Sequence, residues 1–176
     1  MPKTRILAIK IKGIAKTIEK LLGNEKAQLV FTDPPYNVGY DYTGIYKKGK
    51  KSKVPEVRFN DKRKPEEYKE FIGQVFQNAS DFSDNSSPFY CWHASKMDEW
   101  VRKGLEESGW YISQTIIWLK DRMVFSPGQD YHRVYEPCFF GWKKGIKHFV
   151  NRKGTGTFKE FVLLDRQNFE DWLNVL

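Results

Sequence analysis

Stretches with the spacing of an amphipathic helix alternate with short apolar runs along most of this chain. Apolar residues recur at helical spacing in three stretches, 14–22, 65–79 and 95–108. Strand-like apolar runs occupy four others, 27–32, 87–94, 110–120 and 133–143. This order predicts an α/β fold, with a mainly parallel sheet, an antiparallel pair of strands at the sheet edge and helices packed on its faces.

The expected helices carry end signals that support these assignments. Gly23 follows the first helix, where a glycine commonly ends a helix in the left-handed conformation. Pro65 suits the first position of the second helix. Ser95 and Asp98 resemble a capping box at the start of the third helix, and Gly109 marks its end.

Length and composition limit the class of protein. A chain of 176 residues is long enough for one domain with its own core, so we expect a single domain over 1–176. No apolar run reaches the roughly 18 residues of a membrane span, and the first five residues lack the apolar region of a signal peptide. A cytoplasmic protein without a membrane partner is therefore predicted. Cys91 and Cys138 lack metal-ligand spacing, which predicts reduced core thiols and no metal site.

The net charge of +8 is unevenly distributed. Residues 41–64 are rich in glycine, proline and lysine and show no sustained periodicity, which predicts a loop. Its candidate phosphate-binding residues are Lys47, Lys48, Lys50, Lys51, Lys53 and Arg58. A solvated connector is the alternative interpretation of the same residues, but loops of this length in compact domains are usually functional or disordered.

The apolar run 29–32 leads directly into Asp33-Pro34-Pro35-Tyr36. In open α/β sheets, ligands bind beyond the carboxyl ends of the strands, where this tetrapeptide is expected. Each proline fixes its own φ and holds the preceding residue extended. The Asp33 carboxylate and the Pro34 carbonyl are then two acceptors on a stiff backbone, beside the flat ring of Tyr36. A rigid turn without function is the alternative.

Two acceptors beside an aromatic ring suit an amino group on a planar heterocycle, such as N6 of adenine. Hydrogen bonds to both amino hydrogens would localise the nitrogen lone pair and stabilise positive charge that develops there. A base inside a duplex cannot reach such a site, so it would have to be flipped out. Stacking on Tyr36 could return roughly 1–3 kcal/mol of that cost.

Beyond this tetrapeptide, the sequence resembles the DNA amino-methyltransferases, which use S-adenosylmethionine (SAM) to methylate N6 of adenine or N4 of cytosine. The likeness covers about residues 18–145 and follows the order of that family's catalytic half. Its segments are EKLLGNEKAQLVFTDPPYNVGY, FNDKRKPEEYKEFI, PFYCWHASK, TIIWLKD and GQDYHRVYEPCFFGWKKG. It is specific to the branch in which the catalytic segment precedes the cofactor-binding segment. Such enzymes often belong to restriction–modification systems.

The resemblance implies a Rossmann-like methyltransferase fold, SAM as the cofactor and DNA as the partner. It implies that Asp33, Pro34 and Tyr36 hold the target base while Pro35 supports the turn, and aspartate at the first position favours adenine. The residues that match cofactor contacts are Thr32, Asp33, Asn60 and Asp61. The segment from Gln129 to Pro137 matches the one that lines the base pocket in relatives, with a plain edge strand and turn as the alternative. Its candidate DNA contacts are Gln129, Tyr131, His132 and Arg133.

The sequence also departs from the family pattern. The cofactor motif Phe-x-Gly-x-Gly is missing, and Gly154-Thr155-Gly156 follows no apolar strand. Four or five strands are expected where the complete fold has seven. The C-terminal residues 165–176 carry an apolar helical stripe that must pack on something. We therefore expect the catalytic half of the fold, as a fragment, as the product of a naturally shortened gene, or as one half of a split enzyme. Such a chain would work as a homodimer or with a complementing chain. The alternative function is a non-catalytic nucleic-acid-binding subunit.

Overall fold

The computed structural model describes residues 6–8, 14–39, 61–124, 130–146 and 161–163. Its strands are β1 (Ile6–Ala8), β2 (Leu29–Thr32), β3 (Pro88–Trp92), β4 (Trp110–Val124), β5 (Arg133–Lys143) and β6 (Phe161–Leu163). Its helices are α1 (Ile14–Leu22), α2 (Pro65–Phe82), the short 3₁₀ helix η2 (Ser95–Met97) and α3 (Asp98–Glu107). The α/β class expected from the sequence is confirmed.

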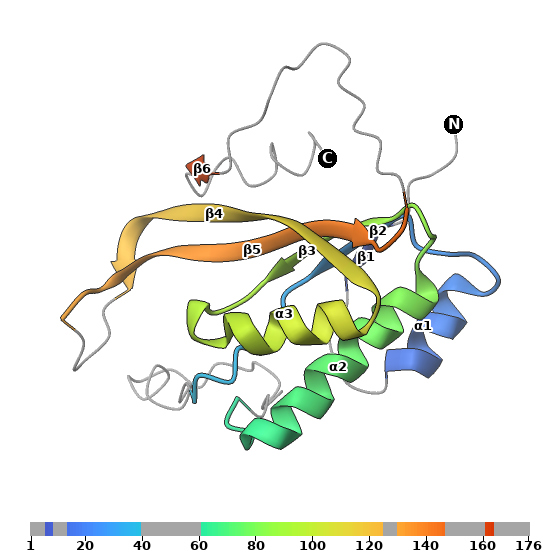
Figure 1. Cartoon of the computed structure of the whole chain (residues 1–176), viewed down its shortest axis with the longest axis horizontal. Helices are drawn as coiled ribbons and strands as arrows, with labels where there is room; N and C mark the ends of the chain where they lie inside the picture. Colours follow the sequence, from blue (N-terminus) through green and yellow to red (C-terminus); the bar gives the residue numbers. More distant parts are fainter. Residues whose placement is uncertain (1–5, 9–13, 40–60, 125–129, 147–160, 164–176) are drawn as a thin grey trace, which may run out of the picture.

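One mixed sheet connects the strands in the order β1-β2-β3-β5-β4-β6 (Figure 1). The pairs β1–β2, β2–β3 and β4–β6 are parallel, and β5 is antiparallel to both β3 and β4. The predicted antiparallel pair is confirmed, but its place at the edge is wrong, because β6 lies outside β4. The three-residue strands β1 and β6 were not expected, since neither shows a clear strand pattern.

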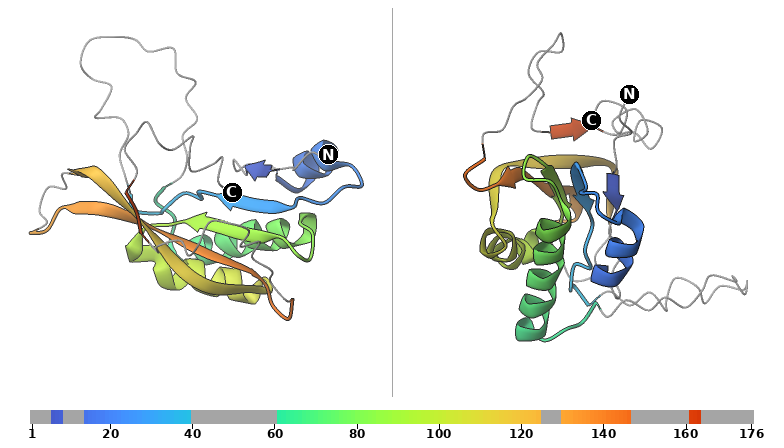
Figure 2. Two further views of the ribbon diagram at one scale, coloured as in Figure 1. Left: turned by 90° about the horizontal axis from the view of Figure 1, so that it is seen from above. Right: turned by 90° about the vertical axis from the view of Figure 1, so that its right-hand side faces the viewer.

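The three α-helices in the described part of the chain lie on the same side of the sheet (Figures 1 and 2). Alternate residues of β2 face them, so Val30 is buried while Phe31 is only partly covered. Ile72 and Phe76 of α2 and Leu105 of α3 are almost completely buried in the same cluster. This apolar burial is the main stabilising contribution to the helix-covered layer.

Helix ends agree with the sequence signals in two cases and differ in one. Gly23 has φ 58°, the left-handed conformation expected after α1, and Pro65 opens α2. The capping box is wrong, because η2 occupies Ser95–Met97 and no side chain caps α3. The Asp98 carboxylate instead contacts His93 and Arg102.

Aromatic side chains continue across the sheet from strand to strand. Phe31 lies 6.2 Å from Tyr90 between ring centroids, and Tyr90 lies 4.9 Å from Phe140. Trp142 follows at 6.0 Å from Phe140, with Tyr111 at 5.2 Å from Trp142. These contacts tie β2, β3, β5 and β4 together through side chains as well as through backbone hydrogen bonds.

Candidate functional site

The Asp33–Tyr36 segment begins where β2 ends. Because β2 and β3 are parallel, with Thr32 opposite Cys91, their carboxyl ends meet at the same edge of the sheet. Asp33 and His93 therefore follow adjacent strand ends. This is the position at which open α/β sheets bind ligands.

Asp33 and Tyr36 are joined by a side-chain hydrogen bond, in which the Tyr36 hydroxyl donates to the Asp33 carboxylate. Burial raises the pKa of Tyr36 far above its ordinary value of 10.0, and the negative charge of Asp33 raises it further. Tyr36 therefore stays protonated and remains a donor at neutral pH. Its hydroxyl orients the carboxylate and occupies part of its acceptor capacity.

The charge of Asp33 is sensitive to its surroundings. Enclosure by protein atoms raises the pKa of its carboxyl group above the ordinary 3.8. The Tyr36 hydrogen bond lowers this pKa, the Glu136 carboxylate raises it and the Lys120 ammonium lowers it. The residue Asp33 as a whole is exposed to solvent, whereas its carboxyl group is partly desolvated by the surrounding protein atoms. Solvent screening therefore reduces the cost of ionising it.

The two prolines are held firmly. Pro34 is fully buried, so a ligand can reach its carbonyl oxygen only after the atoms that cover it move. The Pro35 carbonyl accepts a hydrogen bond from the Tyr68 hydroxyl of α2, at 3.2 Å. Tyr68 is itself 1% exposed. The turn that carries Asp33 is thus attached to the helix layer.

Asn37 forms a hydrogen-bonded clasp with the segment that leads into α2. The Asn37 side chain accepts from the Arg63 backbone N–H at 2.6 Å and donates to the Arg63 carbonyl at 3.1 Å. The Asn37 backbone N–H donates to Asp61 Oδ1 at 2.7 Å, and the Gly39 N–H donates to the Asp61 carbonyl at 2.8 Å. Asn37 has φ 54°, which asparagine tolerates better than most residues. This Asn37 clasp fixes the end of the Asp33–Tyr36 turn.

The residues predicted to contact a cofactor have different surroundings. The Thr32 hydroxyl is buried and has no hydrogen-bond partner among the residues that the structure describes, and Asp33 lies directly after it. Asp61 is 8% exposed and uses one carboxylate oxygen in the Asn37 clasp. Asn60 lies outside the described residues. The cofactor role of all four residues stays a prediction.

Two charged residues that were not singled out from the sequence act on Asp33, although Glu136 lies in the segment predicted to line the base pocket. Lys120 of β4 and Glu136 of β5 form an ion pair. Glu136 raises the pKa of Asp33 and of Tyr36. The two partners are 16 residues apart in the sequence, and only strand pairing, which places Trp118 opposite Glu136, brings them together. A local motif could not have revealed this pair.

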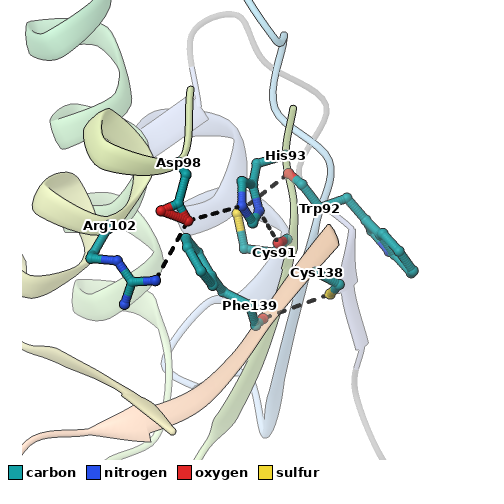
Figure 3. A network of polar contacts seen from close by, with 7 residues as sticks. All are labelled: Cys91, Trp92, His93, Asp98, Arg102, Cys138 and Phe139. Carbon is teal, nitrogen blue, oxygen red and sulfur yellow. Dashed lines mark hydrogen bonds and ion pairs between the residues drawn. The ribbon is translucent and has the colours of Figure 1, made fainter. Parts of the chain in front are cut away.

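His93 belongs to a packed polar network rather than to an open site. Its ring stacks on Phe139 at 4.0 Å, while Nδ1 lies 3.4 Å from the Cys91 carbonyl oxygen and Nε2 lies 3.6 Å from Asp98 Oδ2 (Figure 3). Arg102 contacts both Asp98 and the face of Phe139. Desolvation lowers the pKa of His93 below 6.5. The contacts of this network attach α3 to the end of β3 and to Phe139 in the middle of β5.

The two cysteines are both buried and free, as expected for core thiols. Burial raises the pKa of both Cys91 and Cys138, so neither carries a charge at neutral pH. Within the described residues, no group of three or more His, Cys, Asp or Glu side chains could hold a metal ion. No helix in the described segments is both long and apolar enough to cross a membrane.

The residues predicted to contact DNA fall in two regions. Tyr131, His132 and Arg133 lie at the start of β5, where the β4–β5 hairpin extends beyond β3 (Figure 1). Tyr131 is 91% exposed. Gln129 lies outside the described residues, as does the predicted loop of residues 41–64 except for its last four residues. The part of the loop that is not described contains all its candidate DNA contacts, Lys47, Lys48, Lys50, Lys51, Lys53 and Arg58. Nothing in the fold tests their contact with DNA, which stays a prediction.

Comparison with known proteins identifies the class. A family model described as DNA methylase matches residues 27–172. This match spans most of the chain, including the Asp33–Tyr36 turn, the Asn37 clasp and the β4–β5 hairpin. The chain therefore belongs to this family of DNA methylases.

Solved structures agree with this assignment at the level of fold. A crystal structure of an M1.HpyAVI–SAM complex has a TM-score of 0.53 and 15% sequence identity, and the match covers 88% of this chain and 63% of that one. A crystal structure of M1.HpyAVI has a TM-score of 0.54 and 16% identity, with 88% and 65% covered. The chain thus spans less than two thirds of either solved chain. No curated protein matches the sequence.

Proposed function

We propose that this chain carries out the catalytic half of SAM-dependent methyl transfer to the exocyclic N6 amine of a flipped adenine in DNA. The observation that carries this proposal is the Asp33 carboxylate, which lies just beyond the carboxyl end of β2 and is oriented by Tyr36, in a chain of the DNA methylase family. One of the solved structures that share this fold is a complex of M1.HpyAVI with SAM.

The cofactor would supply a methyl group carried on a positively charged sulfur. Of the described residues, the unpartnered Thr32 hydroxyl and the Asp33 carboxylate fit a group with positive charge and polar substituents. The glycine-rich motif is missing from the sequence, so residues that would hold the remainder of the cofactor are not identified in this chain.

The chain's own groups would prepare the amine. Once the atoms that cover the Pro34 carbonyl have moved, Asp33 and this carbonyl would accept the two amino hydrogens, which would make the nitrogen lone pair available for attack. The cofactor, when bound, would supply its methyl group to this nitrogen and keep the electron pair of its carbon–sulfur bond, so positive charge would develop on the nitrogen. The nearby Asp33 carboxylate stabilises that charge before the surplus proton leaves to the carboxylate or to water.

Replacement of Asp33 tests this mechanism. In an assay with labelled SAM and double-stranded DNA, we expect Asp33→Ala to lower methyl transfer by at least about a hundredfold. Asp81→Ala, at an exposed position near the far end of α2, is the matched control and should leave transfer unchanged. Unaltered transfer by Asp33→Ala would remove this residue from the mechanism. Analysis of the methylated nucleoside separates N6-methyladenine from N4-methylcytosine.

The missing glycine-rich motif favours one other function, a nucleic-acid-binding subunit that needs another chain to bind the cofactor. Calorimetric titration of the isolated chain with SAM separates the two functions. Binding at micromolar concentration would exclude the non-catalytic subunit. If the chain binds DNA but shows no heat with SAM until a complementing chain is added, the subunit function is supported.

A further inference from the structure

The ion pair between Lys120 and Glu136 lies partly inside the protein. Their side chains are only 20% and 27% exposed, respectively. By contrast, the pair between Lys103 and Glu99 on α3 keeps 54% and 72% of its side-chain surface. Water screens the enclosed pair less, so its charges act more strongly on their neighbours.

Contacts between aromatic rings connect this pair to the strand end beside Asp33. The Lys120 ammonium lies 5.3 Å from the centre of the Trp118 ring. Trp118 meets Trp92 edge to face, with 5.8 Å between ring centroids and an interplanar angle of 73°. Trp92 is the last residue of β3, the parallel neighbour of β2. The ion pair is thus attached to the edge of the sheet from which the Asp33–Tyr36 turn emerges.

Five titratable groups interact electrostatically with Asp33 from the surrounding elements: Tyr36, Cys91 of β3, Lys120 of β4, and Glu136 and Cys138 of β5. Tyr36 and both cysteines are neutral, because burial raises each pKa well above neutral pH. Within the described residues, the formal charges that act on Asp33 are therefore those of Lys120 and Glu136. The balance between these two charges decides how readily Asp33 ionises.

We propose that Lys120 and Glu136 are positioning residues for the proposed methyl transfer, and that their ion pair keeps the Asp33 carboxylate both charged and available. This inference rests on the proposed function. Without Lys120, the Glu136 carboxylate would oppose a second negative charge at Asp33. Without Glu136, the Lys120 ammonium would be released to pair with Asp33 and would occupy the oxygens that the amino group of the base needs.

The two partners therefore have opposite effects on Asp33. Lys120→Met should raise the pKa of Asp33, because an uncompensated negative charge remains beside it. Glu136→Gln should lower the pKa of Asp33, because an uncompensated positive charge remains. In the double variant both charges are gone, and the Asp33 titration should return close to that of the wild type. A pair that only stabilises the hairpin would not give opposite shifts that cancel.

The direct test is a pH titration of aspartate carboxyl carbons by nuclear magnetic resonance in the free 176-residue chain. The Asp33 signal is assigned by its loss in Asp33→Asn. Lys103→Met is the control, since it removes the same charge from an exposed pair on α3 and should leave the Asp33 titration in place. Failure of Lys120→Met and Glu136→Gln to move the Asp33 titration in opposite directions would overturn the inference.

Methyl transfer by the same variants gives the second measurement. On the acid side of the titration, each unit of upward shift lowers the ionised fraction of Asp33 about tenfold, so Lys120→Met should lose transfer chiefly at low pH. Glu136→Gln should lose transfer at all pH values, and the double variant should recover most of it. Opposite titration shifts with unchanged transfer would contradict a positioning role. A wild-type chain that binds SAM and DNA but transfers no methyl group would count against the proposed function instead.

Discussion

The negative charge of Asp33 destabilises the folded state. Its pKa is raised chiefly by desolvation, so the folded protein binds a proton at this site more readily than the unfolded chain. Ionisation of Asp33 therefore lowers stability as the pH rises above 3.8, and this loss persists at neutral pH. A group that destabilises the fold in its charged form is a candidate for function.

Asp33→Asn should accordingly raise the free energy of unfolding at neutral pH while it removes methyl transfer. Asparagine has nearly the same shape and no charge to desolvate. Urea denaturation at neutral pH and at about pH 3 measures the effect, and the gain should disappear at the lower pH, where most of the Asp33 carboxyl groups are already protonated. A loss of stability at neutral pH would contradict the direction of this pKa shift.

Asn37 combines an unusual backbone conformation with a paired side chain. Asn37→Gly keeps the left-handed conformation but removes both bonds to Arg63, and should cost about 1–3 kcal/mol of unfolding free energy. Asn37→Ala also removes these bonds, and it places alanine in a left-handed conformation that its Cβ atom disfavours. This variant should therefore lose about 1 kcal/mol more of unfolding free energy than Asn37→Gly. Urea denaturation of both variants checks the difference. Equal stability of Asn37→Gly and the wild type would mean that the Asn37 clasp does not hold the turn.

His93 gives the fold a dependence on pH. Because the pKa of His93 is lowered in the folded state, the unfolded chain binds more protons below about pH 6.5. Its contribution to stability is therefore complete above that pH and is lost as the pH falls. Unfolding free energies measured between about pH 5 and pH 8 should fall less steeply towards acid in His93→Gln than in the wild type. His132→Gln is the matched control, and an unchanged slope in His93→Gln would contradict the assignment.

At the scale of elements, the β4–β5 hairpin depends on a close backbone approach. The register of the pair shifts between Ile112 and Gln114, and this irregularity lies opposite Gly141. A Cβ atom at Gly141 would lie 1.9 Å from the Tyr111 carbonyl oxygen and 2.8 Å from the Phe89 ring. Only glycine allows β5 to pass between these groups.

Gly141→Ala should therefore destabilise the protein by about 3 kcal/mol, because backbone atoms must move to make room. Gly73→Ala is the matched change in α2, where a Cβ atom would meet nothing within 4 Å. There alanine should stabilise the helix by roughly 0.5–1 kcal/mol. Thermal and urea unfolding of the two variants compare these effects. A tolerated Gly141→Ala would show that the hairpin can shift its register.

Helices could be predicted more completely than sheet edges. The helix α2 is recognisable because its proline start and its apolar spacing lie within one stretch of sequence. β1 and β6 have three residues each, too few to show a period, and they exist because a parallel neighbour offers hydrogen-bond partners. The Ser95–Asp98 motif failed because the Asp98 carboxylate contacts His93, which follows β3, and Arg102, one turn further along α3.

For the whole molecule, the net charge of +8 and the family assignment lead to one prediction about DNA binding. Affinity for duplex DNA should fall as salt rises, because bound cations are released from the phosphates. We expect a smaller slope of log Kd against log salt concentration when four lysines of the predicted loop are replaced with glutamine. The slope should decrease by up to about 0.9 for each phosphate that these lysines no longer neutralise. The loop lysines are Lys47, Lys48, Lys50 and Lys51.

The control replaces four exposed lysines on or beside α1, α2 and α3, with the same change in net charge. These are Lys20, Lys69, Lys96 and Lys103. They should affect the salt dependence less, because they belong to the helix layer and not to the predicted DNA-binding loop. Equal effects from the two sets would mean that net charge alone, rather than the loop at 41–64, attracts DNA.

The sequence by itself determined the α/β class, the positions of the main helices and strands, and the Asp33-Pro34-Pro35-Tyr36 turn. Each of these depends on residues close together in the chain, where periodicity and the restricted φ of proline act directly. Only the tertiary structure decided that β6 lies outside β4, that Asn37 is bound to Asp61 and Arg63, and that the charges of Lys120 and Glu136 act on Asp33. Strand order and register are set by the packing of distant segments, and the electrostatic environment of a carboxylate depends on which of them reach it.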